Sequence, residues 1–444
     1  MLAVVVSRAD RASEHIGERL LDLGDWTECE DASVPDAEGG GTYYRTEGAE
    51  LRTFDDLHIH ADGLADPFDD PDLLFVASRH SGGTGPLLTA HPTGNAGPAE
   101  FGGEPGTFAR AAPNALAALL RAFDDHAPEG YGVGMECSHH GPTDIDVPSL
   151  FVELGSDEAQ WDDPAGAAAV ARAILDCRDV PAERDRQLVG FGGGHYAPRF
   201  ERILRETDWA VGHVLADWSL DDMPRPREAS DVLQRAFERS GARHAVVEGD
   251  RPALREVIAD LGYRVVSETW TRETTGVPLA TVESLEERLS TVAEGLRFGS
   301  SATGYEGDCL VRSLPAELAA EAANVDTEAT RTAVAERALA FETEQGGTRP
   351  AGQVALVTAD AFDALVRGLA GVLESKYDDV AIEEGAVVAV KETFDPEAAA
   401  SLGVGEGPAF GRLAAGESVE VDGRTVEPSA VHERRETRFP IEHR

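Results

Sequence analysis

The chain has 444 residues, of which 82 are acidic and 39 basic, so its formal net charge is −43 at pH 7. Its hydrophobic fraction of 42% excludes an intrinsically disordered chain, and its length predicts two domains or one large domain with an appendage. The basic residues are arginines except for Lys376 and Lys391. A dispersed acidic surface with almost no lysine is typical of a molar-salt cytoplasm, where a Debye length of about 3 Å screens self-repulsion.

The charge alone does not identify a partner. In ordinary salt it argues against a nucleic-acid ligand, but in molar salt counterion release contributes little, so shape, stacking and hydrogen bonds would carry affinity. Four cysteines without a CxxC motif exclude a disulfide framework. The N-terminus is typical of a strand rather than a signal peptide, and no apolar run approaches the ~20 residues that span a membrane. We therefore expect a cytoplasmic monomer with no membrane or DNA partner.

Short apolar runs alternate with helical patterns through the first ~270 residues. The expected strands cover residues 2–6, 43–45, 50–54, 73–77, 131–136, 149–154, 188–191, 209–215, 245–248 and 264–267. The expected helices cover residues 8–23, 114–123, 165–176, 199–205, 229–239 and 252–261. Residues 25–41 have the composition of a loop, and His58 and His60 are spaced as on a strand. This order predicts an α/β fold with a mostly parallel central sheet and helices on both faces.

The pattern changes after Trp270. Helices are expected at residues 282–296, 316–340 and 362–373, a strand at 354–358 and a β-hairpin at 418–426. The histidines here are His432 and His443, and no glycine–histidine loop occurs. We predict a domain over residues 1–275 and an acidic C-terminal α+β extension over 276–444, of unknown role.

Three segments of the first domain share one design: a short strand, then small residues, then histidine. They are residues 75–95 (FVASRHSGGTGPLLTAHPTGN), 131–144 (YGVGMECSHHGPTD) and 188–199 (LVGFGGGHYAPR). They contain His80, His91, His139, His140 and His195. A single histidine is more often a core or surface residue than a ligand. Parallel sheets, however, bring such loops together at one edge, so five histidines in equivalent positions favour one shared site.

Histidines that converge with carboxylates are natural ligands for Zn²⁺. The nearby acids are Glu136, Asp144, Asp146 and Glu153. A zinc ion held by two or three of these groups would lower the pKa of a bound water toward about 7 and so supply hydroxide for attack on an ester or amide. The spacing is not a compact zinc signature such as HExxH, so this inference rests on composition. Cys137 could ligate or act as a nucleophile, although a cysteine at a strand end is more often a core residue.

Glycine-rich segments at residues 81–85, 91–95 and 192–194 expose backbone amides that could hold a phosphate or an oxyanion. They match neither the Walker A nor the Rossmann pattern, and tight turns are an equal alternative. Aromatic and arginine side chains nearby could stack on a nucleobase or meet phosphate, although each alone is more often packing or surface. They are Tyr131, Tyr196, Trp218, Arg79, Arg110 and Arg199.

These motifs resemble a known family. The segments SRHS, LLTAHPTGN, MECSHHGPTD, PSLFVELGS and VGFGGGHYAPRF are similar to those of the D-aminoacyl-tRNA deacylases found in archaea and plants. The resemblance runs from Met1 to about residue 275, and the remainder resembles an extension found in salt-loving archaea. It implies zinc-dependent hydrolysis of the ester between a D-amino acid and the terminal adenosine of tRNA. It also implies a fold similar to nucleoside phosphorylases and peptidyl-tRNA hydrolases.

Together, the residues and the resemblance give three sets of candidates. Catalytic candidates are His80, Glu136, His139 and His140. Metal candidates are His91, His139, His140, Asp144, Glu153 and His195. Candidates for binding the 3′ end of the D-aminoacyl-tRNA are Arg79, Ser81, Gly82, Gly83, Thr93, Gly94, Asn95, Gly193, Gly194 and Tyr196. The attacking water could be activated by zinc, by Glu136 or by a histidine, and the glycine amides would stabilise the oxyanion. The alternatives are a peptidyl-tRNA hydrolase, a nucleoside phosphorylase or a non-catalytic protein that binds the tRNA 3′ end.

Overall fold

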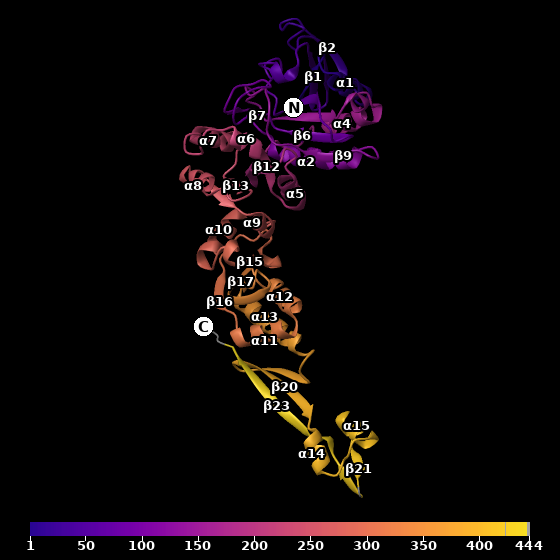
Figure 1. Ribbon diagram of the computed structural model, residues 1–444, viewed down its shortest axis with the longest axis vertical. Coiled ribbons are helices and arrows are strands. Elements are labelled where there is room, and N and C mark those ends of the chain that lie inside the picture. The colour runs from indigo at the N-terminus through magenta and orange to yellow at the C-terminus, as the bar shows by residue number, and fades with distance from the viewer. Residues whose placement is uncertain (422, 442–444) are drawn as a thin grey trace. The chain divides into compact units, whose positions relative to one another are not determined.

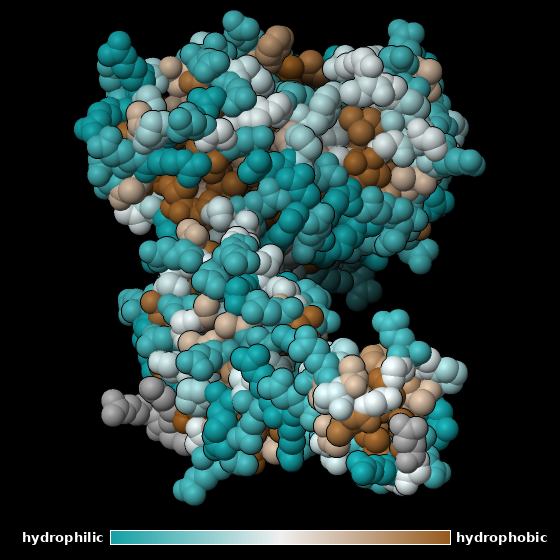
Figure 2. Space-filling view, turned by 60° about the horizontal axis from the view of Figure 1, so that its bottom comes forward, coloured by the Kyte–Doolittle hydropathy of each residue, from teal (hydrophilic) through white to brown (hydrophobic). Residues whose placement is uncertain are grey.

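A computed structural model describes residues 1–421 and 423–441 of the chain. The chain divides into two compact units, Met1–Arg272 and Glu273–Arg444 (Figure 1). Each unit has its own sheets and helices, and they are described separately below. Hydrophilic side chains cover most of the face seen in Figure 2, with smaller hydrophobic patches between them. Within the described ranges, no helix combines the length and the apolar character that a membrane crossing requires.

The first unit contains an eight-stranded sheet in the order β2-β3-β4-β1-β5-β10-β6-β9. Its strands are β1 (Leu2–Ser7), β2 (Thr27–Asp31), β3 (Gly41–Thr46), β4 (Ala49–Phe54), β5 (Leu73–Arg79), β6 (Leu87–His91), β9 (Gly132–Met135) and β10 (Ser149–Gly155). The pairs β1–β4, β1–β5, β5–β10 and β6–β9 are parallel, whereas β2–β3, β3–β4 and β6–β10 are antiparallel. The sheet is therefore mixed, and β2 lies where the sequence predicted a loop.

Helices cover one face of this sheet and loops cover the other. The helices are α1 (Arg11–Leu23), α2 (Pro113–His126), α3 (Glu158–Trp161) and α4 (Pro164–Asp176). The opposite face carries Val5, Val76 and Phe151, which pack against Leu64 and Phe68 from a loop. The prediction of helices on both faces is therefore wrong for this sheet, because residues 55–72 form loops and the short turn η1 (His58–His60) instead of a helix. The small strands β7 (Gly94–Asn95) and β8 (Thr107–Phe108) pair beside it.

A second, fully parallel sheet follows in the order β12-β11-β13-β14. Its strands are β11 (Gln187–Phe191), β12 (Ala210–Leu215), β13 (His244–Val247) and β14 (Arg264–Val266). The helices are α5 (Pro198–Glu206), α6 (Asp217–Asp221), α7 (Ser230–Arg239), α8 (Pro252–Asp260) and α9 (Glu268–Glu273). Leu233 of α7 and Leu254 of α8 share a core with Phe191, and Phe200 of α5 lies against Gly190. The class is α/β, as predicted, but two sheets replace the single expected one.

The second unit is an α+β structure built on antiparallel sheets in the orders β15-β17-β18-β16 and β19-β20-β23 and a hairpin β21-β22. Its strands are β15 (Arg297–Phe298), β16 (Leu310–Ser313), β17 (Ala340–Glu344), β18 (Arg349–Leu356), β19 (Asp379–Glu383), β20 (Ala386–Phe394), β21 (Val419–Val421), β22 (Arg424–Val426) and β23 (His432–Pro440). Its helices are α10 (Leu279–Arg288), α11 (Ala316–Val325), α12 (Thr327–Ala335), α13 (Ala359–Leu373), α14 (Pro396–Ser401) and α15 (Pro408–Ala414). The helix expected over residues 316–340 breaks at Asp326, whose side chain caps α12 by accepting from the Ala329 amide. Asp422 and His443 lie outside the described residues.

Candidate functional site

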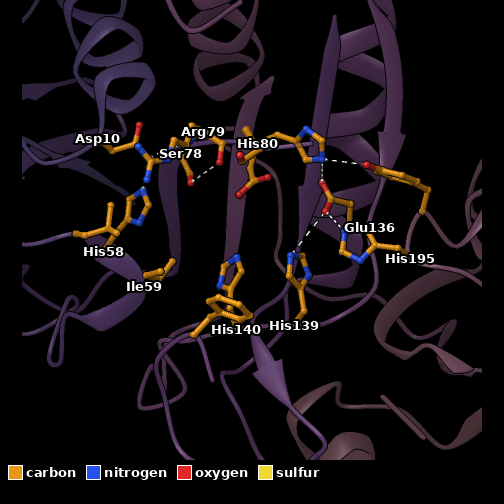
Figure 3. A pocket seen from close by; sticks show the side chains of 15 residues that line it. Asp10, His58, Ile59, Ser78, Arg79, His80, Glu136, His139, His140 and His195 are labelled. Carbon is orange, nitrogen blue, oxygen red and sulfur yellow. Dashed lines mark hydrogen bonds and ion pairs between the residues drawn. The ribbon is translucent and has the colours of Figure 1, made fainter. Parts of the chain in front are cut away.

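A pocket of about 450 Å³ opens on the loop-covered face of the eight-stranded sheet (Figure 3). Its lining consists of Asp10, Leu57, His58, Ile59, Ser78, Arg79, His80, Ser81, Phe101, Glu136, His139, His140, Glu153, His195 and Tyr196. The sequence predicted a site at the carboxyl edge of parallel strands. Because β6 runs antiparallel to β10, the carboxyl ends of β5 and β6 point in opposite directions, and the side chains meet over the face of the sheet instead.

Six of these side chains, together with the buried His91 beside them, form a group that we call the histidine–carboxylate cluster. Its members are His80, His91, Glu136, His139, His140, Glu153 and His195. His91 ends β6 and Glu153 lies in β10, whereas the others follow β5, β9 and β11. Gly155 of β10 is required here, because a Cβ at this position would lie 2.6 Å from the His80 ring. All five histidines that the sequence singled out are therefore brought together.

Outer hydrogen bonds fix how the imidazoles point. Nδ1 lies 2.8 Å from the Cys137 carbonyl in His139, 2.6 Å from the Gly141 carbonyl in His140 and 3.3 Å from the Pro92 carbonyl in His91. A carbonyl can only accept, so each of these Nδ1 atoms carries the hydrogen and Nε2 is directed inward. His80 follows the same rule: its Nδ1 is 2.9 Å from Ser156 Oγ, which itself donates to the Gly85 carbonyl. Such outer partners are typical of metal-ligating histidines.

Glu136 lies at the centre of the cluster with a side chain only 1% exposed. His195 Nε2 donates to its Oε2 at 2.6 Å. The Nε2 atoms of His139 and His80 face its oxygens at 3.7 Å, and Oε1 has no hydrogen-bond partner. Lone pairs that face a carboxylate oxygen repel it unless a hydrogen or a cation lies between them. The geometry therefore indicates a place for a cation or a hydrogen-bond donor between Glu136 and these Nε2 atoms.

The buried ionisable groups shift one another's pKa values. Burial alone would raise the pKa of Glu136, but the hydrogen bond from His195 and the charge of His91 lower it overall. The same hydrogen bond raises the pKa of His195. Burial lowers the pKa of His80, and it lowers the pKa values of His139 and His140 far more, helped by repulsion between imidazoles. His80, His139 and His140 are therefore neutral near pH 7, with Nε2 free to accept.

His91 and Glu153 form a second buried pair, in which Nε2 and Oε1 are 3.5 Å apart. Burial raises the pKa of Glu153. Burial also lowers the pKa of His91, but the contact with Glu153 outweighs this and raises it overall. The pair therefore holds a proton that a bound cation would displace. Nε2 of His91 has no hydrogen-bond partner, which again marks a place for a ligand.

These residues fit a metal ion. Potential ligand atoms lie within 4.8 Å of one another in three groups: His91–His139–His140, His91–Glu136–Glu153 and Cys137–His139–His195. Imidazole and carboxylate are ligands that suit zinc. The third group fits less well, because burial and the charge of Glu136 raise the pKa of Cys137 to about 12. A thiol with this pKa is neither a ready ligand nor a nucleophile.

Several predicted residues lie elsewhere. The Asp144 carboxylate is exposed and accepts from the Gly63 amide, outside every metal-ligand group found among the described residues. Thr93, Gly94 and Asn95 are buried beneath the site: Thr93 bonds the Pro142 carbonyl and Asn95 the Gly102 carbonyl. They support the loops and do not line the pocket.

The predicted glycine amides are also largely occupied. Gly82 N–H donates to the Ser156 carbonyl, and Gly193 N–H donates to Asp217 Oδ1. Gly192 N–H donates to the Leu215 carbonyl. Gly83 and Gly194 have no atom within 4 Å of where a Cβ would stand, so a substrate could approach their backbone. Arg79, Ser81 and Tyr196 line the pocket directly.

The sequence did not single out Asp10, His58, Phe101, Ser156 or His213. His213 is buried in β12 and joins Ser138 Oγ (2.8 Å) to the Ala109 carbonyl (2.9 Å), so it holds the segment that carries His139 and His140. Burial lowers its pKa to about 4, which keeps it neutral. In the sequence, His213 stands in an apolar run typical of a buried strand, and Asp10 stands where a helix cap is expected. Neither pattern indicates a pocket.

Three exposed aromatic side chains surround this region. Phe101 is 65% exposed, Trp218 46% and Tyr196 36%, and no other Phe, Tyr or Trp among the described residues is as exposed. Tyr196 Oη lies 3.2 Å from His80 Nε2, and the Trp218 side chain is near enough to the Cys137 thiol to lower its pKa slightly against the effect of burial. Tyr196 and Trp218 therefore adjoin the histidine–carboxylate cluster, although the sequence favoured a structural role for Trp218.

Comparisons with known proteins identify the family. A family model described as D-aminoacyl-tRNA deacylase matches residues 67–266. A protein of Natronomonas pharaonis named D-aminoacyl-tRNA deacylase is 58% identical over 99% of this chain and 100% of its own length. The chain belongs to the D-aminoacyl-tRNA deacylase family. Proteins with the same name from Halorubrum lacusprofundi and Methanococcoides burtonii are 55% and 33% identical over 100% and 98% of this chain, and 97% and 95% of their own lengths.

The resemblance seen in the sequence is thus confirmed, and the relatives extend through both units of the chain. A crystal structure described as a conserved protein of unknown function is also similar, with 28% identity and a TM-score of 0.55. The match covers 62% of this chain and 98% of that one.

Proposed function

We propose that this deacylase cleaves the ester between a D-amino acid and the 3′-terminal adenosine of tRNA at the histidine–carboxylate cluster. The observation that carries the proposal is the position of Glu136, buried and ionised, with imidazoles of His80, His139 and His195 around it in an open pocket. Hydrolysis of an ester needs an activated water, a group that takes its proton and a group that protonates the leaving oxygen. The cluster contains candidates for each task.

A zinc ion is the cofactor that these residues fit best. His91, His139 and His140 would hold it, with a carboxylate oxygen of Glu136 or Glu153 completing the set. When bound, zinc would acidify a water and polarise the ester carbonyl. In this assignment Asp144 is not a ligand, and His195 is left for another task.

The remaining residues handle protons. His80 is neutral, and its Nε2 accepts within the pocket, so it is suited to take a proton from the attacking water. The hydrogen bond from Nε2 to Glu136 raises the pKa of His195 and so favours its imidazolium form, in which Nδ1 carries a second proton. This Nδ1 proton is the one that His195 can give up, and its side chain is 36% exposed, so it can reach substrate. We assign His80 as general base and His195 as general acid toward the departing ribose oxygen. Glu136 orients the His195 ring, Ser156 orients the His80 ring, and the Glu136 charge stabilises the imidazolium form of either histidine.

The nucleotide end of the substrate is placed by the aromatic side chains. The Tyr196 ring lies 5.1 Å from the His195 ring and Trp218 lies near Cys137, and both offer exposed ring faces to unpaired bases of the tRNA 3′ end. Stacking contributes about 1–3 kcal/mol per base and does not depend on phosphate charge. It therefore suits a chain with a net charge of −43, whose binding cannot rely on counterion release.

We assign this chemistry to the predicted domain of residues 1–275, which contains the whole first unit, on a scaffold of the kind used by nucleoside phosphorylases and peptidyl-tRNA hydrolases. The extension, residues 276–444, is an accessory part in a monomeric cytoplasmic enzyme. A chain that ends after Arg272 should retain the D-specific rate within a few-fold. Loss of that rate in a chain that still folds would contradict this division of roles.

The test is deacylation of D-Tyr-tRNA and L-Tyr-tRNA in molar KCl, with and without a zinc chelator. We expect turnover of the D-substrate alone, lost on chelation and restored by Zn²⁺. N-acetyl-aminoacyl-tRNA, and inosine with phosphate, should not react. Equal rates on both enantiomers would remove the proofreading role, and binding of tRNA without hydrolysis would contradict the enzyme assignment.

A further inference from the structure

The pocket continues beyond the histidine–carboxylate cluster to an end that the reaction described above does not use. In Figure 3, Asp10, His58 and Ile59 lie together on one side, and Glu136 and His195 lie on the other. Leu57, Ile59 and Phe101 give this second end apolar walls. It therefore combines one buried carboxylate, one imidazole and hydrophobic surface.

His58 is the unusual member of this end. Its side chain is 2% exposed, yet neither ring nitrogen has a hydrogen-bond partner. Asp10 Oδ2 is 3.4 Å from His58 Nε2, close enough to orient the ring but long for a hydrogen bond. A buried imidazole is ordinarily satisfied, so two unpartnered nitrogens in a pocket indicate a place where a ligand supplies the missing contact.

Asp10 is held firmly. Its Oδ1 accepts from the Ser13 amide at 3.0 Å, which caps α1, and its Oδ2 accepts from the Arg79 amide at 3.3 Å. The Arg79 guanidinium lies over the Trp161 ring at 5.4 Å, with Nε still 3.8 Å from Asp10. Burial would raise the pKa of Asp10, but the contact with His58 lowers it overall, so the carboxylate stays ionised. This end is therefore built to accept hydrogen bonds from a cationic group.

We propose that Asp10 and His58 bind the α-ammonium group of the aminoacyl ester. The inference rests on the proposed function, which places the ester at the histidine–carboxylate cluster and the nucleotide beside Tyr196 and Trp218. The amino acid must then extend toward the unused end, where an ammonium meets Asp10 and His58 and a side chain meets Ile59 and Phe101. A phosphate would be repelled there by Asp10.

This contact also explains how enantiomers can be told apart. The ester carbonyl and the ammonium fix two of the substituents around Cα. With those two fixed, exchanging D for L exchanges the positions of the side chain and the hydrogen, so the pocket walls accept one and clash with the other. Without the ammonium contact, an L-substrate could rotate to avoid the clash. Asp10 and His58 are thus specificity residues rather than catalytic ones.

The test compares D-Tyr-tRNA with its deaminated analogue, in which a hydroxyl replaces the ammonium group. Wild type should prefer D-Tyr-tRNA in kcat/KM by about 10- to 100-fold, the effect of a hydrogen bond to a charged group. His58→Ala should bring this ratio close to one by slowing D-Tyr-tRNA while leaving the analogue unchanged, and should also reduce the D-to-L preference. Asp10→Asn, which can still cap α1, should act in the same direction.

His60→Ala is the matched control, because His60 is exposed in the same short turn and does not line this pocket. It should leave the ratio as in wild type. A wild-type enzyme that cleaves both substrates equally, as expected if this end holds the adenosine instead, would overturn the inference while the proposed function stands. Equal loss of both rates in His58→Ala, with the ratio unchanged, would also overturn it. Failure of wild type on every aminoacyl-tRNA would refute the proposed function itself.

Discussion

Two regions of the first unit bury ionisable side chains, but only one of them provides every such group with a partner. In β4, Arg52 and Glu50 are 3% and 0% exposed, and both are paired. Arg52 lies 2.6 Å from Glu50, 3.0 Å from Asp31 and 2.8 Å from the Gly39 carbonyl, and Glu50 also lies 2.6 Å from Arg45. In the pocket and directly behind it, both ring nitrogens of His58, Nε2 of His91 and Oε1 of Glu136 are equally buried and have no hydrogen-bond partner. The first region is complete without a ligand, whereas the second is not.

The difference separates structure from function. Buried charge is expensive unless it is paired, so a satisfied pair reports on folding and an unsatisfied one reports on what binds there. The second unit supports this contrast, because its buried polar residues among those described are Thr274, Thr330 and Thr343, none of them ionisable. Nothing in its described core resembles the histidine–carboxylate cluster.

The largest expected effect comes from removing two of the inward-facing imidazoles. His139→Ala with His140→Ala should lower the single-turnover rate on D-Tyr-tRNA by about 10³-fold or more, as loss of activated water requires. Neither Nε2 atom is hydrogen-bonded among the described residues. Removing the two rings should therefore change the thermal unfolding temperature little. Denaturation of the variant, with no folded enzyme to assay, would show that the cluster is structural after all.

The opposite result is expected at the satisfied pair. Arg52→Ala removes the buried one of the two arginines that pair with Glu50, leaving only the more exposed Arg45 at 2.6 Å, and should destabilise the first unit by about 3 kcal/mol. The rate per folded molecule should stay within two-fold of wild type, because Arg52 does not line the pocket. Urea unfolding followed by circular dichroism measures the first quantity, and a rate normalised to folded protein the second. A large loss of the deacylation rate in Arg52→Ala without a loss of stability would contradict the distinction between the satisfied pair and the pocket.

A smaller effect is expected at His213, which touches no substrate and only positions the loop after β9. His213→Ala should lower kcat by about 10- to 100-fold with KM nearly unchanged, since small displacements of catalytic groups have such costs. His213→Asn, which can still bond Ser138, should recover part of the rate. His244→Ala is the control, because His244 is also a buried histidine of the second sheet but stacks on Trp270, away from the pocket.

Much of this could be predicted from the sequence. The strand–helix alternation gave the α/β class, and the glycine–histidine loops identified His80, His91, His139, His140 and His195, which the structure brings together. The place of their meeting could not be predicted, because it depends on β6 running antiparallel to β10, a pairing that no local pattern records. Asp144 was included because of its motif, yet backbone geometry turns it to solvent.

The second half of the pocket was missed for a related reason. His58 was interpreted as part of a strand, since its spacing with His60 alternates, but it lies in a short 3-10 turn. Asp10 has the sequence of an ordinary helix cap and serves as one, so its role in the pocket has no separate signal. Only the parallel pairing of β1 with β5 places Asp10 beside Arg79 and the pocket.

The central claim is that ester cleavage depends on the unsatisfied carboxylate of Glu136. The most direct measurement is the single-turnover rate of D-Tyr-tRNA deacylation in molar KCl for wild type and Glu136→Gln, with the folded fraction of each determined in parallel. We predict a loss of about 10³-fold with folding unchanged, since the amide keeps the shape but not the charge that holds His195 and His80. A Glu136→Gln enzyme that deacylates D-Tyr-tRNA at the wild-type rate would contradict the account.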